Sequence, residues 1–217
     1  MKLKYIYLEL AAILAFLVLP PIVTGAGSIK SSADYLTWTI IFQLLLSVLL
    51  DVQYRFSIKK AQDRIYYFQY LYHGALTLGL LMIIHALFQA LAIAFPSLKG
   101  TVSSIPFLKP QSPIQWITFT LNIATASFYE ESLYRQFLPE AFRTVAGNSR
   151  PLRLALEALT VLLFAFAHRY LGLMAVLNAA LCGTVLRLCA IKTRGIYTTA
   201  AVHFIYNMLL YLFLFFV

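Results

Sequence analysis

The chain has 217 residues, of which 61% are hydrophobic and only 12% are charged, and its mean hydropathy is +0.80. A soluble domain averages about 25% charged residues, so this composition excludes an ordinary soluble domain and indicates a polytopic membrane protein. The basic balance, 17 Lys and Arg against 8 Asp and Glu, is typical of cytoplasmic loops in such proteins and does not indicate nucleic-acid binding.

Long apolar segments follow one another along the chain, and each is predicted to be a transmembrane helix. Long runs rich in Leu, Ala and Ile favour helices over the alternating strands of a β-barrel. The fold class is therefore predicted to be all-α, a transmembrane helical bundle of about seven spans (roughly six to eight). The expected spans are residues 5–23, 35–52, 66–95, 114–142, 154–167, 171–191 and 196–217.

The first span could instead be a cleaved signal peptide, because a patch of small residues follows it at 24–28. Its length and the pair Pro20-Pro21 favour an uncleaved helix. No stretch resembles a separate soluble domain, so residues 1–217 are predicted to form one integral membrane domain. Residues 1–95 carry no motif, and residues 114–217 carry the motifs described below.

Basic residues set the expected orientation. With this set of spans, twelve Lys and Arg fall on the side of the N-terminus and four on the other side, while Arg135 lies inside a span. This bias predicts a multi-pass protein with a cytoplasmic N-terminus and an outer C-terminus. The expected location is a bacterial or archaeal cell membrane. The twelve are Lys2, Lys4, Arg55, Lys59, Lys60, Arg64, Arg143, Arg150, Arg153, Arg187, Lys192 and Arg194, and the four are Lys30, Lys99, Lys109 and Arg169.

Two adjacent carboxylates stand in the fourth expected span, in the stretch FYEESLYRQF at residues 128–137. Ionisable groups inside a span are costly and usually face the protein interior. Glu131 and Arg135 are four residues apart, so they lie on one helix face and can form an ion pair. Glu130 projects about 100° away and has no such partner nearby in the sequence. The cluster could be a functional site or a buried ion-pair network that fixes helix packing.

Further polar groups lie in the later spans. His168 ends the apolar run FAFAH, where it could also be an interfacial histidine beside Arg169. His203 and Asn207 are four residues apart in HFIYN, so they share one face of the last span. This pair could hydrogen-bond a substrate carbonyl, or it could join one helix to another.

The remaining polar groups inside spans indicate no chemistry. His73 and His85 have no carboxylate beside them in the sequence and are expected to be packing or interfacial groups. Cys182 and Cys189 lie seven residues apart in one apolar run without a CxxC motif, so they are expected to be buried thiols. Asp51 is near a span end, where a charge needs no special explanation.

In this order along the chain, EESLYR (130–135), FAFAH (164–168) and HFIYN (203–207) resemble the EExxxR, FxxxH and HxxxN motifs of one family. It is the CAAX-protease and bacteriocin-processing (Abi) family of intramembrane glutamic endopeptidases. The resemblance implies that Glu130 is a general base that activates a water molecule, with His168 as its partner. It also implies that His203 and Asn207 stabilise the oxyanion.

The same resemblance implies that Glu131 and Arg135 structure the site and that catalysis uses no metal or other cofactor. Glu and His side chains could instead bind zinc, but the chain has no HExxH motif and the groups come from three spans. The expected substrate is a membrane-associated protein or peptide, and the sequence leaves open whether it is prenylated.

Two other functions stay open at this point. Some members of the family act as scaffolds or immunity proteins, so a non-proteolytic membrane protein of the same fold is the first alternative. The second is a proton-coupled transporter, because buried Glu and His side chains also serve as proton relays. A transporter would show paired, interrupted helices in two halves of the chain, and no such symmetry is visible.

Helix geometry also predicts how deep the site lies. At 1.5 Å per residue, Glu130 is about 15–18 Å and His203 about 12 Å from the cytoplasmic ends of their spans. His168 lies at a similar depth only if its span enters the membrane near Ala158, beyond Glu157. The sequence therefore predicts a short, recessed fifth span and a water-filled cavity open towards the cytoplasmic half.

Overall fold

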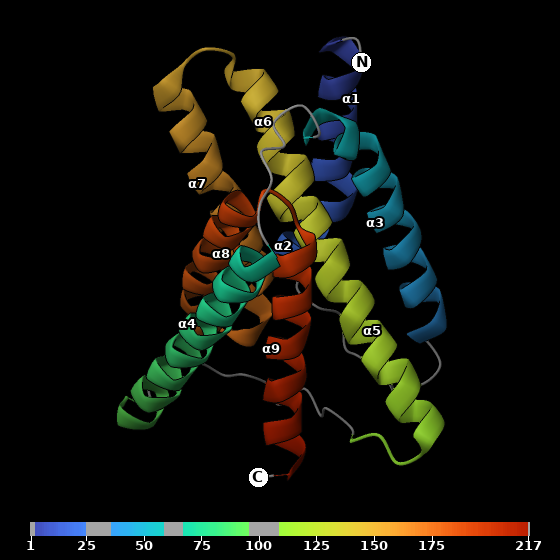
Figure 1. The fold of residues 1–217 in the computed structure, drawn as a ribbon, viewed down its shortest axis with the longest axis vertical. Helices are drawn as coiled ribbons and strands as arrows, with labels where there is room; N and C mark the ends of the chain where they lie inside the picture. Colours follow the sequence, from blue (N-terminus) through green and yellow to red (C-terminus); the bar gives the residue numbers. More distant parts are fainter. Residues whose placement is uncertain (1–2, 25–35, 59–66, 96–108, 217) are drawn as a thin grey trace. The chain divides into compact units, whose positions relative to one another are not determined.

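The computed structural model of the chain describes residues 3–24, 36–58, 67–95 and 109–216 (Figure 1). In this part of the chain, each expected span coincides with a helical run, and the all-α prediction is confirmed. The elements are α1 (Leu3–Ile13), η1 (Leu14–Val18), α2 (Leu19–Thr24), α3 (Leu36–Ile58), α4 (Tyr67–Ala94), α5 (Pro113–Glu131), η4 (Ser132–Phe137), α6 (Leu138–Ala146), α7 (Arg150–Ala167), η5 (Arg169–Leu171), α8 (Leu173–Thr193) and α9 (Tyr197–Phe216).

Large apolar side chains lie on the outer surface of these helices. Phe16, Trp38 and Ile93 are each more than three-quarters exposed. Extensive apolar surface of this kind is stable in lipid but not in water, so the chain is a membrane protein. Within the described residues, four helical stretches are long and apolar enough to cross a bilayer, and Trp38–Val52 is a shorter apolar one. The four are Ile6–Val23, Tyr67–Ala94, Leu173–Thr193 and Tyr197–Phe216.

In the part of the chain that the structure describes, two helical runs contain a π-helical turn, and in both runs proline follows the turn. The turn η1 precedes Pro20 and Pro21, and the turn η4 precedes Pro139. Proline has no N–H for the carbonyl four residues earlier, and its ring crowds that carbonyl, so the helix before it widens or bends. The fourth expected span is therefore a run of two α-helices joined by a wide turn, where a single helix over 114–142 was expected.

The connection between α6 and α7 is shorter than the expected link over residues 143–153, and that prediction is wrong. Gly147 has a positive φ of 55°, which ends α6 at Ala146. The Ser149 hydroxyl then accepts a hydrogen bond from the backbone N–H of Leu152, and α7 begins at Arg150. The helix is 18 residues long and includes the charged residues at its start, so the helix itself is not short. The predicted depth of its apolar part stays a prediction.

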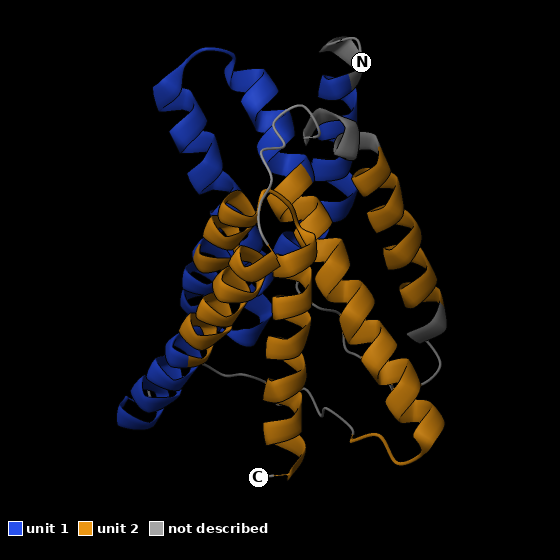
Figure 2. Cartoon of the chain, viewed as in Figure 1, with its two compact units in different colours: residues 1–28, 83–105, 137–184 blue, residues 29–82, 106–136, 185–217 orange. Residues whose placement is uncertain are grey.

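The described residues form two compact units (Figure 2). Unit 1 comprises residues 1–28, 83–105 and 137–184, and unit 2 comprises residues 29–82, 106–136 and 185–217. In unit 1, α6 packs on α7, while α1 contacts α6 and α2 contacts α7. The side chains of Phe137 and Leu138 are fully buried there. The expectation of a single membrane domain stays a prediction.

In unit 2, α5 contacts α3 on one side and α9 on the other (Figure 1). The Thr125 hydroxyl of α5 donates a hydrogen bond to Gln43 Oε1 of α3 at 2.9 Å. Gly74 lets α4 approach α9 closely, because a Cβ atom there would lie 3.3 Å from Thr198 Cγ2. These contacts bring the end of α5, which carries the glutamates, and the middle of α9, which carries His203 and Asn207, into one packed unit.

Candidate active site

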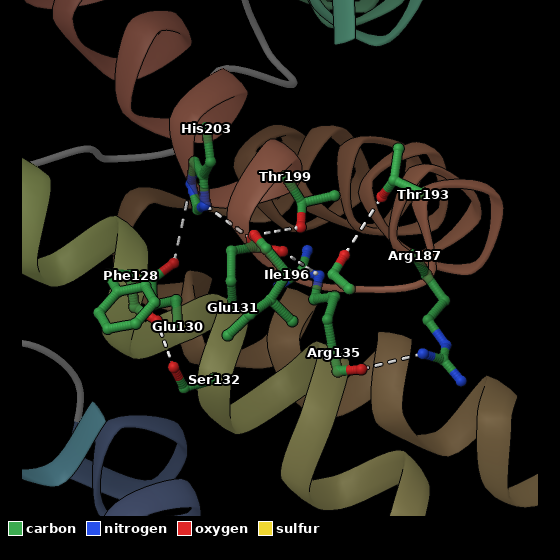
Figure 3. A network of polar contacts seen from close by, with 11 residues as sticks. Phe128, Glu130, Glu131, Ser132, Arg135, Arg187, Thr193, Ile196, Thr199 and His203 are labelled. Carbon is green, nitrogen blue, oxygen red and sulfur yellow. Dashed lines mark hydrogen bonds and ion pairs between the residues drawn. The ribbon is translucent and has the colours of Figure 1, made fainter. Parts of the chain in front are cut away.

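The two adjacent glutamates form the C-terminal end of α5, directly before the turn η4 (Figure 3). The N-terminus of α5 is fixed by Ser112, whose hydroxyl accepts a hydrogen bond from the backbone N–H of Gln115 at 3.3 Å. Because α5 packs along α9, its last turn lies in the interior of unit 2. Glu131 is 0% exposed, whereas the side chain of Glu130 is 29% exposed.

Glu131 is held by two partners from different elements. Its Oε2 atom lies 3.3 Å from Nε of Arg135, and its Oε1 atom lies 2.9 Å from Nδ1 of His203. The predicted pairing of Glu131 with Arg135 is confirmed. The contact with His203 joins residues 72 positions apart, so no local spacing could reveal it. The Glu131 carboxylate is therefore fixed between η4 and α9.

Glu130 has a different environment. Its Oε2 atom lies 3.8 Å from Nε2 of His203, which is longer than a hydrogen bond (Figure 3). This Oε2 atom is buried and makes no hydrogen bond to any residue that the structure describes. Both glutamates thus face the His203 ring, but only Glu131 is hydrogen-bonded to it.

The His203 ring lies between the two carboxylates, and its hydrogen bond places one of its protons. The Glu131 oxygens, which also face the Arg135 guanidinium, act as acceptors, so Nδ1 of His203 donates. In a neutral ring, Nε2 then carries a lone pair on the side of Glu130. Nε2 can donate to another oxygen only when the ring holds a second proton.

Asn207 lies one turn after His203 in α9 and contacts a residue that the sequence did not single out. Its Nδ2 atom donates a hydrogen bond to the Ser127 hydroxyl at 3.4 Å. Ser127 is 1% exposed and precedes Glu130 by three residues, so both lie on neighbouring faces of α5. The position of Ser127, about one helical turn before the glutamates, is the sequence signal that could have singled it out. The contact orients the Asn207 amide and leaves a second N–H on it.

His168 follows the last residue of α7 and belongs to unit 1. Its Nδ1 atom lies 2.9 Å from the backbone carbonyl oxygen of Phe164, and the two rings meet edge to face at 4.8 Å. A carbonyl can only accept, so Nδ1 donates and Nε2 is left as an acceptor. The FxxxH spacing therefore fixes the ring and its tautomer. The partnership of His168 with Glu130, which belongs to unit 2, stays a prediction.

Arg187 is a second cation at the glutamate-bearing segment. The charge count assigns it to the cytoplasmic side, although residue 187 falls inside the expected span 171–191, and in the structure it lies within α8. Its Nη1 atom donates a hydrogen bond to the backbone carbonyl oxygen of Arg135 at 2.9 Å (Figure 3). A charged residue six positions before the end of a helix was the signal that could have singled it out.

Asp51 is also more than a charge near a span end. Because α3 continues to Ile58, Asp51 lies inside the helix and is only 5% exposed. Its Oδ2 atom accepts a hydrogen bond from the Tyr197 hydroxyl, at the start of α9, at 2.6 Å. The Tyr197 ring also stacks on Phe128, two residues before Glu130. These contacts brace α9 and α5 from α3.

No three His, Cys, Asp or Glu side chains among the described residues are grouped so that they could hold a metal ion. Metal independence is nevertheless a prediction about the reaction, and it needs its own experiment. Cys182 and Cys189 are both buried and free of disulfides, as predicted.

These observations define a class of protein, an all-α membrane protein with two adjacent glutamates, one buried and one partly exposed, that both face one histidine from a later helix. Residues 112–209 match the family described as type II CAAX prenyl endopeptidase Rce1-like, which is a protease family. This match covers the motif-bearing part of the chain, and it supports the resemblance that the three motifs indicate. No curated protein and no solved structure matched the chain.

Proposed function

We propose that the protein is an intramembrane endopeptidase that hydrolyses a peptide bond in a membrane-associated protein or peptide. The match to an endopeptidase family supports this function. The observation that carries it is the difference between two adjacent glutamates. Glu131 is buried and held by Arg135 and His203, whereas Glu130 is partly exposed and lies beyond hydrogen-bond distance of His203. Glu130 is therefore the carboxylate that a water molecule can approach.

Peptide hydrolysis needs a nucleophile, a base and a group that stabilises negative charge. We assign water as the nucleophile and Glu130 as the base. The water oxygen attacks the carbonyl carbon of the scissile bond while its proton passes to Glu130, and this proton is then given to the leaving nitrogen. His168 is assigned as the second group on the water. Its Nε2 atom is an acceptor because Nδ1 is bonded to the Phe164 carbonyl.

His203 and Asn207 are assigned to the oxyanion. Asn207 retains an N–H after its contact with Ser127, and amide donors of this kind stabilise tetrahedral intermediates. His203 can donate from Nε2 when the ring holds two protons, and Nε2 lies on the side of Glu130. Both groups come from one face of α9.

Glu131 and Arg135 are assigned as site-structuring residues, because their side chains bond mainly to each other and to the His203 ring. The membrane setting we propose is multi-pass with a cytoplasmic N-terminus, and the mechanism we propose uses no metal.

The test is cleavage by the purified full-length chain in liposomes. The probes are membrane-anchored peptides with and without a prenyl group, and the measured quantity is the rate of cleavage. Because a positioned acid–base group contributes about 10²–10⁴-fold, Glu130→Gln and His168→Ala are each expected to lose about that factor. The rate should survive a metal chelator.

Glu140→Gln is the matched control. Glu140 follows the glutamate pair in the same helical run, but its contact is an ion pair with Arg143 whose two side chains are 32% and 68% exposed. Exposed pairs contribute little, so this variant should cleave within about twofold of the wild type. Equal cleavage by wild type and Glu130→Gln rejects the assignment of the base. Complete loss with a chelator rejects the metal-free mechanism.

A further inference from the structure

The backbone of the turn η4 receives a hydrogen bond from a side chain outside the three motifs. Arg187 reaches from α8 and donates from Nη1 to the carbonyl oxygen of Arg135 at 2.9 Å. Arg135 is the residue whose Nε atom faces Glu131. Arg187 is therefore bonded to the main chain of the residue whose side chain fixes the buried glutamate (Figure 3).

Local chemistry explains why this carbonyl benefits from a side-chain donor. In a regular helix, the carbonyl of Arg135 would accept from the backbone N–H of residue 139. Residue 139 is proline, which has no N–H. A buried carbonyl without a donor costs about 1–3 kcal/mol, and a guanidinium supplies a charge-assisted hydrogen bond in its place.

We propose that Arg187 is a positioning residue, which stabilises the wide turn η4 through the Arg135 carbonyl and so holds Arg135 against Glu131. It replaces the N–H that Pro139 lacks. The rival account is that the charge of Arg187 acts on the carboxylates directly, and the two roles make different predictions. Only the role through the Arg135 carbonyl depends on whether residue 139 has a backbone N–H. The kinetic part of the proposal rests on the proposed function, whereas the stability part does not.

The experiment is a double-mutant cycle on thermal unfolding of the full-length chain in detergent. Arg187→Met keeps most of the apolar stem and removes the donor, so its unfolding midpoint should fall by about 4–8 °C. Arg187→Lys retains a donor and should recover at least half of that loss. Pro139→Ala restores a backbone N–H, so Arg187→Met in the Pro139→Ala background should cost less than half as much as in the wild type.

Lys192→Met is the matched control, because Lys192 is an exposed cation in the last turn of the same helix. Its midpoint should lie within about 1 °C of the wild type, as surface substitutions change stability little. If Arg187→Met does not fold, recovery of folded protein by adding Pro139→Ala supports the proposal, and failure to recover it contradicts it. An equal cost of Arg187→Met in both backgrounds overturns the proposal.

Cleavage of the membrane-anchored peptides gives a second readout. A displaced Arg135 disturbs the reacting geometry more than substrate binding, so Arg187→Met should lower kcat about tenfold with KM unchanged within twofold, and Pro139→Ala should restore part of kcat. A rise in KM alone, or no kinetic rescue by Pro139→Ala, contradicts the positioning role. If the wild type cleaves no peptide, the proposed function fails, while the unfolding cycle still decides whether Arg187 acts through the Arg135 carbonyl.

Discussion

Glu130 and Glu131 are neighbours in sequence, yet their surroundings separate two tasks that a single carboxylate cannot perform together. A carboxylate that faces a guanidinium and is hydrogen-bonded to an imidazole fixes geometry, and Glu131 is 0% exposed. A carboxylate that no hydrogen bond holds can take up the proton of a water molecule. One helical step of about 100° is enough to turn the two side chains towards these different surroundings.

This separation predicts opposite profiles for two conservative substitutions. Glu131→Gln removes the charge that faces a buried arginine, and breaking a buried pair typically costs about 3–5 kcal/mol. Among the described residues Glu130 Oε2 has no hydrogen-bond partner to lose, so Glu130→Gln should change the free energy of unfolding by less than about 1 kcal/mol. Thermal unfolding in detergent and the yield of monodisperse protein measure both effects. A Glu130→Gln variant that is as unstable as Glu131→Gln would show that both glutamates are structural.

The sequence predicted the site at this scale only where the partners are local. The pairing of Glu131 with Arg135 follows from a four-residue spacing. The contacts of His203 with Glu131 and of Arg187 with Arg135 join residues 72 and 52 positions apart. They depend on how α8 and α9 pack, which a single sequence does not encode in any local pattern.

At the scale of helices, proline is the residue that shapes the site. The wide turn η4 lies between the glutamates and Pro139, as η1 lies before Pro20 and Pro21. Proline inside an apolar helical run is readable from the sequence, so the interruption of the fourth span could have been predicted. Which form it takes, a kink or a π-helical turn, depends on the packing around it.

The link between α3 and α9 gives a prediction at this scale. Tyr197→Phe removes the hydroxyl that donates to the buried Asp51 carboxylate. Hydrogen bonds to charged groups contribute about 1.5–3 kcal/mol, and because Tyr197 is 54% exposed, we expect a loss of about 1–2 kcal/mol. Thermal unfolding in detergent measures it. Asp51→Asn, which keeps an acceptor, should lose less.

Tyr67→Phe serves as the control for this substitution, because Tyr67 is 89% exposed and lies at the start of α4. Its unfolding midpoint should not move. If Tyr197→Phe unfolds at the same temperature as Tyr67→Phe, the bond to Asp51 does not brace α9, and the position of His203 must depend on other contacts of that helix.

At the scale of the whole chain, contacts within each unit join helix ends that the charge bias places on the same side of the membrane. In unit 1, Arg169 donates a hydrogen bond to the Val23 carbonyl, and both are expected outside. In unit 2, Lys109 donates to the Phe215 carbonyl at 3.4 Å, and both are expected outside. Asp51 and Tyr197 are both expected near the cytoplasmic side. These contacts support the proposed multi-pass arrangement.

Arg187 is removed from the basic residues counted on the cytoplasmic side, because it lies within α8 and donates a hydrogen bond to a backbone carbonyl. Eleven Lys and Arg then remain against four. The positive-inside bias is unchanged in direction, so the charge argument does not depend on Arg187. Composition alone does not determine the number of spans. Among the described residues, four helical stretches have the length and hydropathy of a span, and the other helices are shorter or more polar.

Cysteine labelling in intact cells tests the orientation with little background, because the two native cysteines are 6% and 3% exposed. Asn148→Cys, in the link between α6 and α7, is expected to face the cytoplasm, and Gln111→Cys, before α5, is expected to face outward. A membrane-impermeant maleimide should therefore label Gln111→Cys in intact cells and label Asn148→Cys only after the cells are opened. The reverse pattern would invert the topology, and labelling of both sites in intact cells would contradict a single membrane crossing between residues 111 and 148.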